Sequence, residues 1–299
     1  MKAKTILFSL FFFLVCSSVY GQEYENLFAR LQGISNRGVD FFNIDGIEIT
    51  SQKINAEFSA RNCARMFPQL RIKRRELTSS DSLLDFRNYY VHKSEENPPN
   101  FFNNISYYFV ESTDKKIIAF TFASINKNDR EFERKFIQLV RNNSIPESVF
   151  HSVEIDSINF VGRKIPLGRS CRWMGVNNVQ CPHYGQMNWS VHKDMENASA
   201  TVNNQFVSVT SRRGGRVVSD TTVCVIFEGV ETTARKVVYN FTGARSALLK
   251  MEGSNQLTIY LVSAAVRDKF VSCVMSFWGS DQINPSGLPP LLEQVMKLK

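Results

Sequence analysis

Histidine is scarce in this chain, and none of its four copies stands in a known catalytic arrangement. The chain has 299 residues, and its histidines are His92, His151, His183 and His192. The sequence also contains no G-x-S-x-G, H-E-x-x-H, P-loop or dinucleotide-binding motif. Catalytic triads assemble in space from distant residues, so this absence weakens the case for an enzyme without deciding it. No catalytic residue is predicted.

Long apolar runs are missing, and the longest one is too short to cross a bilayer. A membrane-spanning helix needs roughly 18 apolar residues or more, whereas the run Ile6–Cys16 has eleven residues. Two lysines precede this run, and the small residues Val19 and Gly21 follow it at the spacing of a cleavage site. This pattern predicts a signal peptide at residues 1–21, cleaved after Gly21. We expect an exported protein, periplasmic or secreted, with no transmembrane segment in the mature chain.

Acidic residues are in modest deficit. The formal net charge is +8, and removal of the signal peptide, with two lysines and no acids, lowers it to +6. Basic clusters at 71–75 and 212–216 would suit nucleic acid. An exported protein does not meet nucleic acid, however, and charge at strand ends and turns also prevents edge-to-edge aggregation. No nucleic-acid partner is expected, and the mild basic excess favours anionic surfaces without requiring them.

Cysteine is sparse but informative. Five cysteines remain after cleavage, and exported proteins usually oxidise theirs, so at least one thiol is left over. Cys171 and Cys181 are the expected pair, because they close a short segment rich in turn residues. Cys224 and Cys273 lie in expected strands and either pair with each other or fill the core. Cys63 lies on the apolar side of an expected helix, where a buried free thiol is the simplest interpretation.

The order of expected elements indicates the α+β class, with antiparallel sheets and helices on one face. Alternating β-formers predict hairpins at 105–111 with 117–124 and at 256–264 with 269–278. A helix with one apolar side is expected after each, at 129–142 and at the C-terminus. The domains are therefore drawn at 22–146 and 147–299. The two segments are either tandem related halves or two uses of a common unit.

Two further helices are expected, one early in each half. Ser51 is a candidate N-cap for a helix running to about Met66, where Pro68 would stop it. In the second half, a helix is expected at about 187–203. Each would place a strand and a helix before the run of strands in its half.

The segment 166–190 combines the cysteine pair with aromatic residues and glycines. Trp173, Tyr184 and Trp189 could stack on a sugar or hold an apolar peptide, because aromatic faces give large contact area at low entropic cost. The alternative is that these side chains form a small satellite core. Segments of this length without regular structure are often functional, so the three aromatic residues are the candidate binding residues.

Metal binding is not expected. The spacing of Cys171, Cys181, His183 and His192 matches no compact zinc signature. No cofactor is expected either.

Three functions remain open from the sequence. The first is a non-catalytic binding protein that uses the disulfide-closed segment to contact an envelope protein or a glycan. The second is an envelope hydrolase acting on glycan or peptide, with a site near His183, His192 and Asp194. The third is a structural component of an envelope assembly. The oligomeric state is left open.

Overall fold

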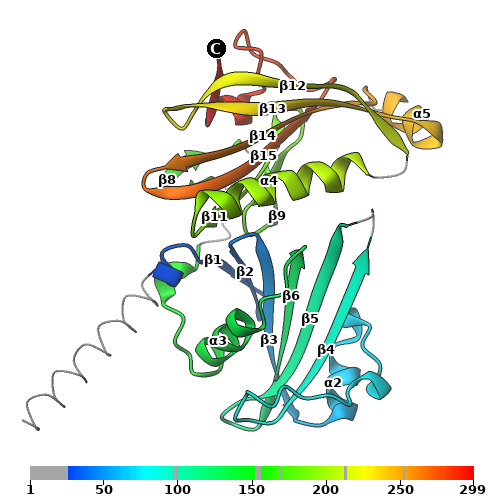
Figure 1. Ribbon diagram of the computed structural model, residues 1–299, viewed down its shortest axis with the longest axis vertical. Helices are drawn as coiled ribbons and strands as arrows, with labels where there is room; N and C mark the ends of the chain where they lie inside the picture. The colour runs from blue at the N-terminus through cyan, green and yellow to red at the C-terminus, as the bar shows by residue number, and fades with distance from the viewer. Residues whose placement is uncertain are drawn as a thin grey trace, which may run out of the picture.

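The chain folds as a β-rich α+β protein built on two antiparallel sheets (Figure 1). The computed structural model describes residues 26–96, 98, 100–151, 156–168, 170–211, 214–251 and 253–299. The predicted signal peptide therefore lies outside the described residues. In Figure 1 the second sheet lies above the first, and helix α4 lies between them.

The first sheet has six strands, each antiparallel to its neighbours. In spatial order they are β1 (Gln32–Asn36), β2 (Val39–Ile44), β3 (Ile47–Glu57), β6 (Lys116–Ile125), β5 (Phe102–Glu111) and β4 (Asn88–Glu96). Helix α2 (Ala60–Met66) follows β3, and helix α3 (Arg130–Arg141) follows β6. Short 3₁₀ turns at Pro68–Leu70, Arg74–Glu76 and Glu147–Val149 complete this half.

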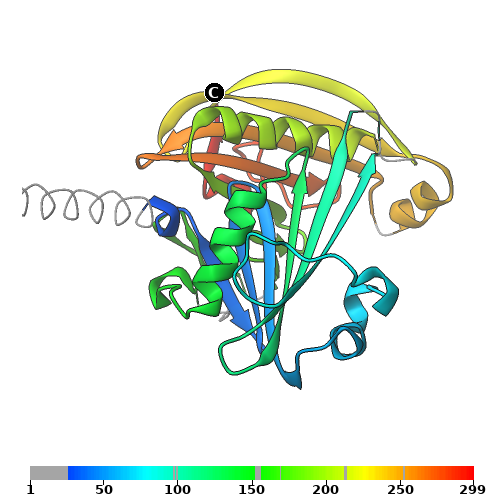
Figure 2. The same ribbon diagram turned by 60° about the horizontal axis from the view of Figure 1, so that its bottom comes forward.

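The helices of the first sheet cover both of its faces, so the prediction of helices on one face is wrong here. Consecutive residues of the central strands are buried, at Tyr108–Val110 and Ile117–Phe120. Successive side chains of a strand point to opposite faces, and both faces must therefore be covered. Phe136 of α3 packs in the core of one face, and Cys63 of α2 packs in the core of the other. Figure 2 shows α2 and α3 on either side of the strands.

The second sheet has eight strands, again antiparallel throughout. In spatial order they are β16 (Met296–Leu298), β12 (Gly215–Phe227), β13 (Val230–Phe241), β14 (Gln256–Val266), β15 (Lys269–Trp278), β11 (Gly185–His192), β10 (Asn178–Cys181) and β9 (Arg172–Gly175). Helix α5 (Gly243–Met251) connects β13 to β14.

Both faces of the second sheet are also covered. Helix α4 (Met195–Thr210) packs Val202 against Ile259 and Leu261 on one face. The opposite face carries helix α6 (Pro290–Glu293) and the small hairpin of β7 (Ser157–Phe160) and β8 (Arg163–Pro166). The one-face prediction fails here for the same reason as in the first sheet.

The two sheets share an order of connections. In each, three sequential strands lead into a helix, and a second run of sequential strands ends by pairing with the third strand of the first run. The pairs are β3 with β6 and β11 with β15. This similarity supports the expected relation between the halves, which stays a prediction. The chain remains with the first sheet until Phe150, which bridges to Gly33 in β1.

The β2–β3 turn joins the halves. The Asp45 amide donates to the Val191 carbonyl at 3.1 Å, and the Lys193 amide donates to the Asp45 carboxylate at 2.8 Å. Gly46 has φ +77°, and a Cβ there would lie 2.9 Å from the Thr201 hydroxyl of α4. Glycine is therefore needed both for the turn and for the close approach to the helix. In the described part of the chain, no helix is long and apolar enough to cross a membrane.

Candidate binding site

The predicted disulfide between Cys171 and Cys181 is confirmed. It joins the start of β9 to the end of β10, so it closes a short hairpin. The segment expected as an irregular loop is largely strand, because β11 pairs with β15 and carries β10 and β9 as an extension of the sheet. The disulfide therefore fixes the edge of a sheet rather than a free loop.

The alternative in which Cys224 pairs with Cys273 is wrong. Cys224 on β12 is an exposed free thiol, and Cys273 on β15 is a buried one. Strands β13 and β14 lie between β12 and β15, which places the two strands about 14 Å apart at ordinary strand spacing. A disulfide requires Cα atoms within about 7 Å. Cys63 is free and buried, as expected.

The three aromatic candidates do not form one surface. Trp189 is 1% exposed, and its ring centroid lies 5.3 Å from that of Phe160. Its prediction as a contact residue is wrong, because the β11 face that carries it is turned into the core. Trp173 is half-buried opposite Val179 and packs on the same core. Tyr184 is exposed, at 37%.

Tyr184 and the disulfide border a cavity of about 460 Å³. The described residues that line the cavity are uncharged: Pro166, Leu167, Gly168, Ser170, Cys171, Cys181, Tyr184, Pro290, Leu291 and Gln294. This volume lies within the range of small-molecule and side-chain pockets, about 300–1,000 Å³. The lining gives apolar contact area together with a few hydroxyl and amide groups.

The cavity is assembled from three distant segments. The Leu291 amide of α6 donates to the Tyr184 carbonyl at 3.1 Å, and the Gln282 amide donates to the His183 carbonyl at 2.8 Å. Gly185 has φ +100°, and a Cβ there would lie 2.7 Å from Leu292. A glycine at this turn therefore lets α6 approach the disulfide and complete the cavity.

The histidines expected in a hydrolase site lie far apart. His183 precedes β11 and His192 ends it, so the two histidines lie at opposite ends of this eight-residue strand, which spans roughly 24 Å. His192 is 1% exposed and its Nε2 lies 2.8 Å from the Ser272 hydroxyl. Burial lowers the pKa of His192 to about 4. Asp194 accepts from the Asn197 amide at 2.8 Å and so caps helix α4. These residues do not assemble into one site.

Sequence reasoning missed half of the cavity. Leu291 belongs to the C-terminal helix that was expected from its apolar side, and nothing in the sequence indicated that this helix would contact the disulfide. The contacts span more than a hundred residues of sequence, between Tyr184 and Leu291. Local periodicity carries no information about such pairs.

No protein-family model matches the chain, and no curated protein matches it in sequence. Within the described ranges, no group of three or more His, Cys, Asp or Glu side chains could hold a metal ion.

Proposed function

We propose that this chain is an exported, non-catalytic binding protein, and that the cavity beside Cys171–Cys181 receives an apolar side chain of a partner protein. The observation that carries the proposal is the cavity of about 460 Å³, whose described lining is uncharged, with Tyr184 exposed at its border. A disulfide is typical of proteins that fold under oxidising conditions, which supports the exported location.

The lining favours an apolar group over a charged one. Leu167 and Leu291 provide apolar wall, and none of the described residues of the lining could pair with a buried charge. A charged group that entered the cavity would lose its hydration, and no opposite charge among the described lining residues would compensate that cost. The Tyr184 hydroxyl and the Gln294 amide can orient the main chain that carries the bound side chain.

The disulfide also favours binding on energetic grounds. Cys171 and Cys181 form part of the cavity wall. A wall that is already ordered loses little conformational entropy when a partner binds. Tyrosine at the border adds a large contact area with few rotatable bonds.

Site-specific photo-cross-linking tests the proposal. A benzophenone amino acid replaces Tyr184 in one version of the full chain and Met174 in another. Met174 is the matched control, because it is 60% exposed on the neighbouring β9 but does not line the cavity. We expect one protein adduct from position 184 in the cell envelope and none from position 174. Equal adducts from both positions would favour a broad structural assembly surface and contradict the proposal.

The affinity of the cross-linked partner gives the second measurement. A peptide covering its cross-linked segment is titrated against wild type, Tyr184→Ala and Met174→Ala. Loss of an aromatic anchor costs about 2 kcal/mol, or roughly thirtyfold in Kd. We expect that loss for Tyr184→Ala and no change for Met174→Ala. An unchanged Kd in Tyr184→Ala would remove the cavity from the binding site.

A further inference from the structure

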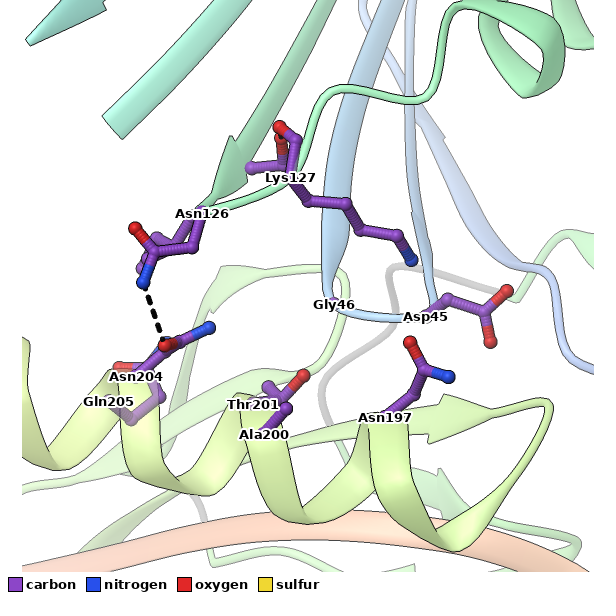
Figure 3. Close-up of a pocket in the computed structure, with 11 residues that line it drawn as sticks. Asp45, Gly46, Asn126, Lys127, Asn197, Ala200, Thr201, Asn204 and Gln205 are labelled. Atoms are coloured by element: carbon purple, nitrogen blue, oxygen red, sulfur yellow. Dashed lines mark hydrogen bonds between the residues drawn. The ribbon is translucent and has the colours of Figure 1, made fainter. Parts of the chain in front are cut away.

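A second cavity lies between the two halves of the molecule, on the side of α4 that faces the first sheet (Figure 3). Its volume is about 420 Å³. One wall is helix α4, with Asn197, Thr201, Asn204 and Gln205. The other wall comes from the β2–β3 turn and the end of β6, and it includes Asp45, Gly46, Ser124, Asn126 and Lys127. Each half of the molecule thus contributes one wall, and the second half does so through helix α4.

Helix α4 presents an unusual polar side to this cavity. Its apolar side packs on the second sheet through Val202 and Phe206. The polar side of such a helix normally carries lysine, glutamate and arginine. In α4 the described residues Met195–Thr210 include a single charged side chain, Glu196, and the side facing the cavity carries amides and a hydroxyl. Figure 3 shows Thr201 and Asn197 pointing from the helix into the cavity.

The cavity adjoins a smaller polar pocket of about 150 Å³, here called the inner pocket, whose lining includes the carboxylate of Glu48 at its exposed side. Thr201 and Gln205 line both spaces. The inner pocket adds Ser190 and Ser272, which are buried. It also adds Asn43, which is 8% exposed and whose side-chain oxygen has no hydrogen-bond partner among the described residues. A buried acceptor without a partner costs free energy, and this oxygen has no accessible surface that a ligand in the pocket could contact.

The charges of the outer cavity are nearly balanced. Asp45 pairs with Arg30 at 3.3 Å and accepts from the Lys193 amide. Lys127 is the cationic side chain of the lining, and Figure 3 shows it extending toward Asp45. A phosphate or nucleic-acid ligand would need several free cations, and the described lining does not supply them.

From this geometry we propose that the cleft between the halves binds a neutral glycan. Each amide side chain offers a donor and an acceptor, and each hydroxyl offers both. Sugar hydroxyl groups likewise donate and accept, so a wall of amides and hydroxyls can satisfy several of them at once.

A peptide main chain fits this cleft less well. Extended peptides are usually bound along a free strand edge, which supplies main-chain hydrogen bonds. Strand β3 begins at the cleft and strand β6 ends there, and both are paired on both sides within the first sheet. Neither strand therefore offers a free edge to a peptide.

A glycan array tests the proposal with the full mature chain. The array carries the neutral oligomers chitohexaose, maltohexaose, cellohexaose and mannohexaose, and the acidic polymers polygalacturonate and heparin. The test variant is Thr201→Val with Gln205→Ala, which removes a hydroxyl and an amide while keeping the shape at Gly46. The matched control is Asn203→Ala, an exposed residue of the same helix that does not line the cleft.

We expect binding to at least one neutral oligomer, weakened about tenfold in the test variant and unchanged in Asn203→Ala. Calorimetric titration with that oligomer gives the Kd, and thermal melting shows that both variants are folded. Binding to the acidic polymers alone, binding to no oligomer, or equal weakening in the control would overturn the proposal. Tyr184→Ala should leave glycan binding unchanged, which separates this site from the disulfide cavity.

Discussion

At the scale of single residues, His192 is the clearest case of a group that is kept neutral by its position. It ends β11 next to the inner pocket, with its ring fully buried. Burial is the largest cause that lowers its pKa to about 4; Asp45 and Asp194 raise the pKa, while Lys127 and Arg30 lower it. Its Nε2 meets the Ser272 hydroxyl at 2.8 Å. The ring is thus part of the packing between the halves.

This burial predicts that the protein loses stability in mild acid. The folded pKa is about 4 and the ordinary value is 6.5, so the unfolded chain binds a proton more readily between these pH values. The contribution of neutral His192 to the free energy of unfolding is fully present above pH 6.5. It declines as the pH falls and is smaller by about 3 kcal/mol at pH 4. Urea unfolding at several pH values measures this decline. The variant His192→Gln should show a flatter profile than wild type.

The comparison must be made as a difference between two proteins. Burial also lowers the pKa of His151 and, together with Arg130, that of His92. Both histidines therefore also reduce the free energy of unfolding as the pH falls. Subtracting the pH profile of the free energy of unfolding of His192→Gln from that of wild type isolates the contribution of His192. The exposed His183 gives the control variant His183→Gln. Parallel profiles for wild type and His192→Gln would show that His192 does not titrate differently on unfolding.

At the scale of elements, the disulfide holds the β9–β10 hairpin at the edge of the second sheet. Its two cysteines are separated by 10 residues in sequence. Closing a loop of this length removes about 3 kcal/mol of chain entropy from the unfolded state. We therefore expect Cys171→Ser with Cys181→Ser to lower the free energy of unfolding by about that amount. Urea unfolding of the oxidised protein and of the double variant measures it.

A free thiol provides the matched control for that measurement. Cys224 is exposed on β12 and forms no disulfide, so Cys224→Ser should change stability by no more than about 0.5 kcal/mol. Equal stability of wild type and the double variant would mean that the hairpin is held by strand pairing alone.

The elements with strong local patterns were predicted well. The hairpin expected at 105–111 and 117–124 is β5 with β6, and the helix expected at 129–142 is α3 at Arg130–Arg141. The hairpin expected at 256–264 and 269–278 is β14 with β15. In these segments the periodicity of apolar residues and the turn residues indicate the same structure.

The helices expected at 51–66 and 187–203 were wrong over much of their length. Strand β3 continues to Glu57 because β6 pairs with it, and Ser59 rather than Ser51 caps helix α2. Likewise Gly185–His192 is strand β11, paired with β15, and helix α4 begins only at Met195. In both cases a partner strand distant in sequence decided the structure.

At the scale of the whole molecule, both candidate sites depend on contacts between distant segments. The disulfide cavity needs Tyr184 beside α6, and the cleft needs α4 beside the end of β6. The sequence indicated the disulfide and Tyr184, but it could not show that Trp189 faces the core. It also gave no sign that the amides of α4 would face Asn126 across a cleft, where the Asn126 amide donates to Asn204 at 3.3 Å.

The cleft can exist only while the halves stay together, and Asp45 is central to that contact. Its amide donates to Val191, and its carboxylate accepts from the Lys193 amide while it pairs with Arg30. Both the Arg30 and the Asp45 side chains are largely buried, at 15% and 11% exposed. Removal of one member of such a buried pair is strongly destabilising, because the other charge is left without a partner.

This contact predicts that Asp45→Ala uncouples the two halves. We expect one calorimetric transition for wild type and two for Asp45→Ala, with a loss of about 3 kcal/mol. Asp45→Asn keeps an acceptor for the Lys193 amide, so it should lie between the two. The control is Asp114→Ala, which breaks an exposed pair with Lys53 inside the first half; solvent screens such exposed pairs, so they stabilise little. A single transition in Asp45→Ala would mean that the sheets are coupled by their remaining contacts. In that case the cleft would keep its shape without the Asp45 carboxylate.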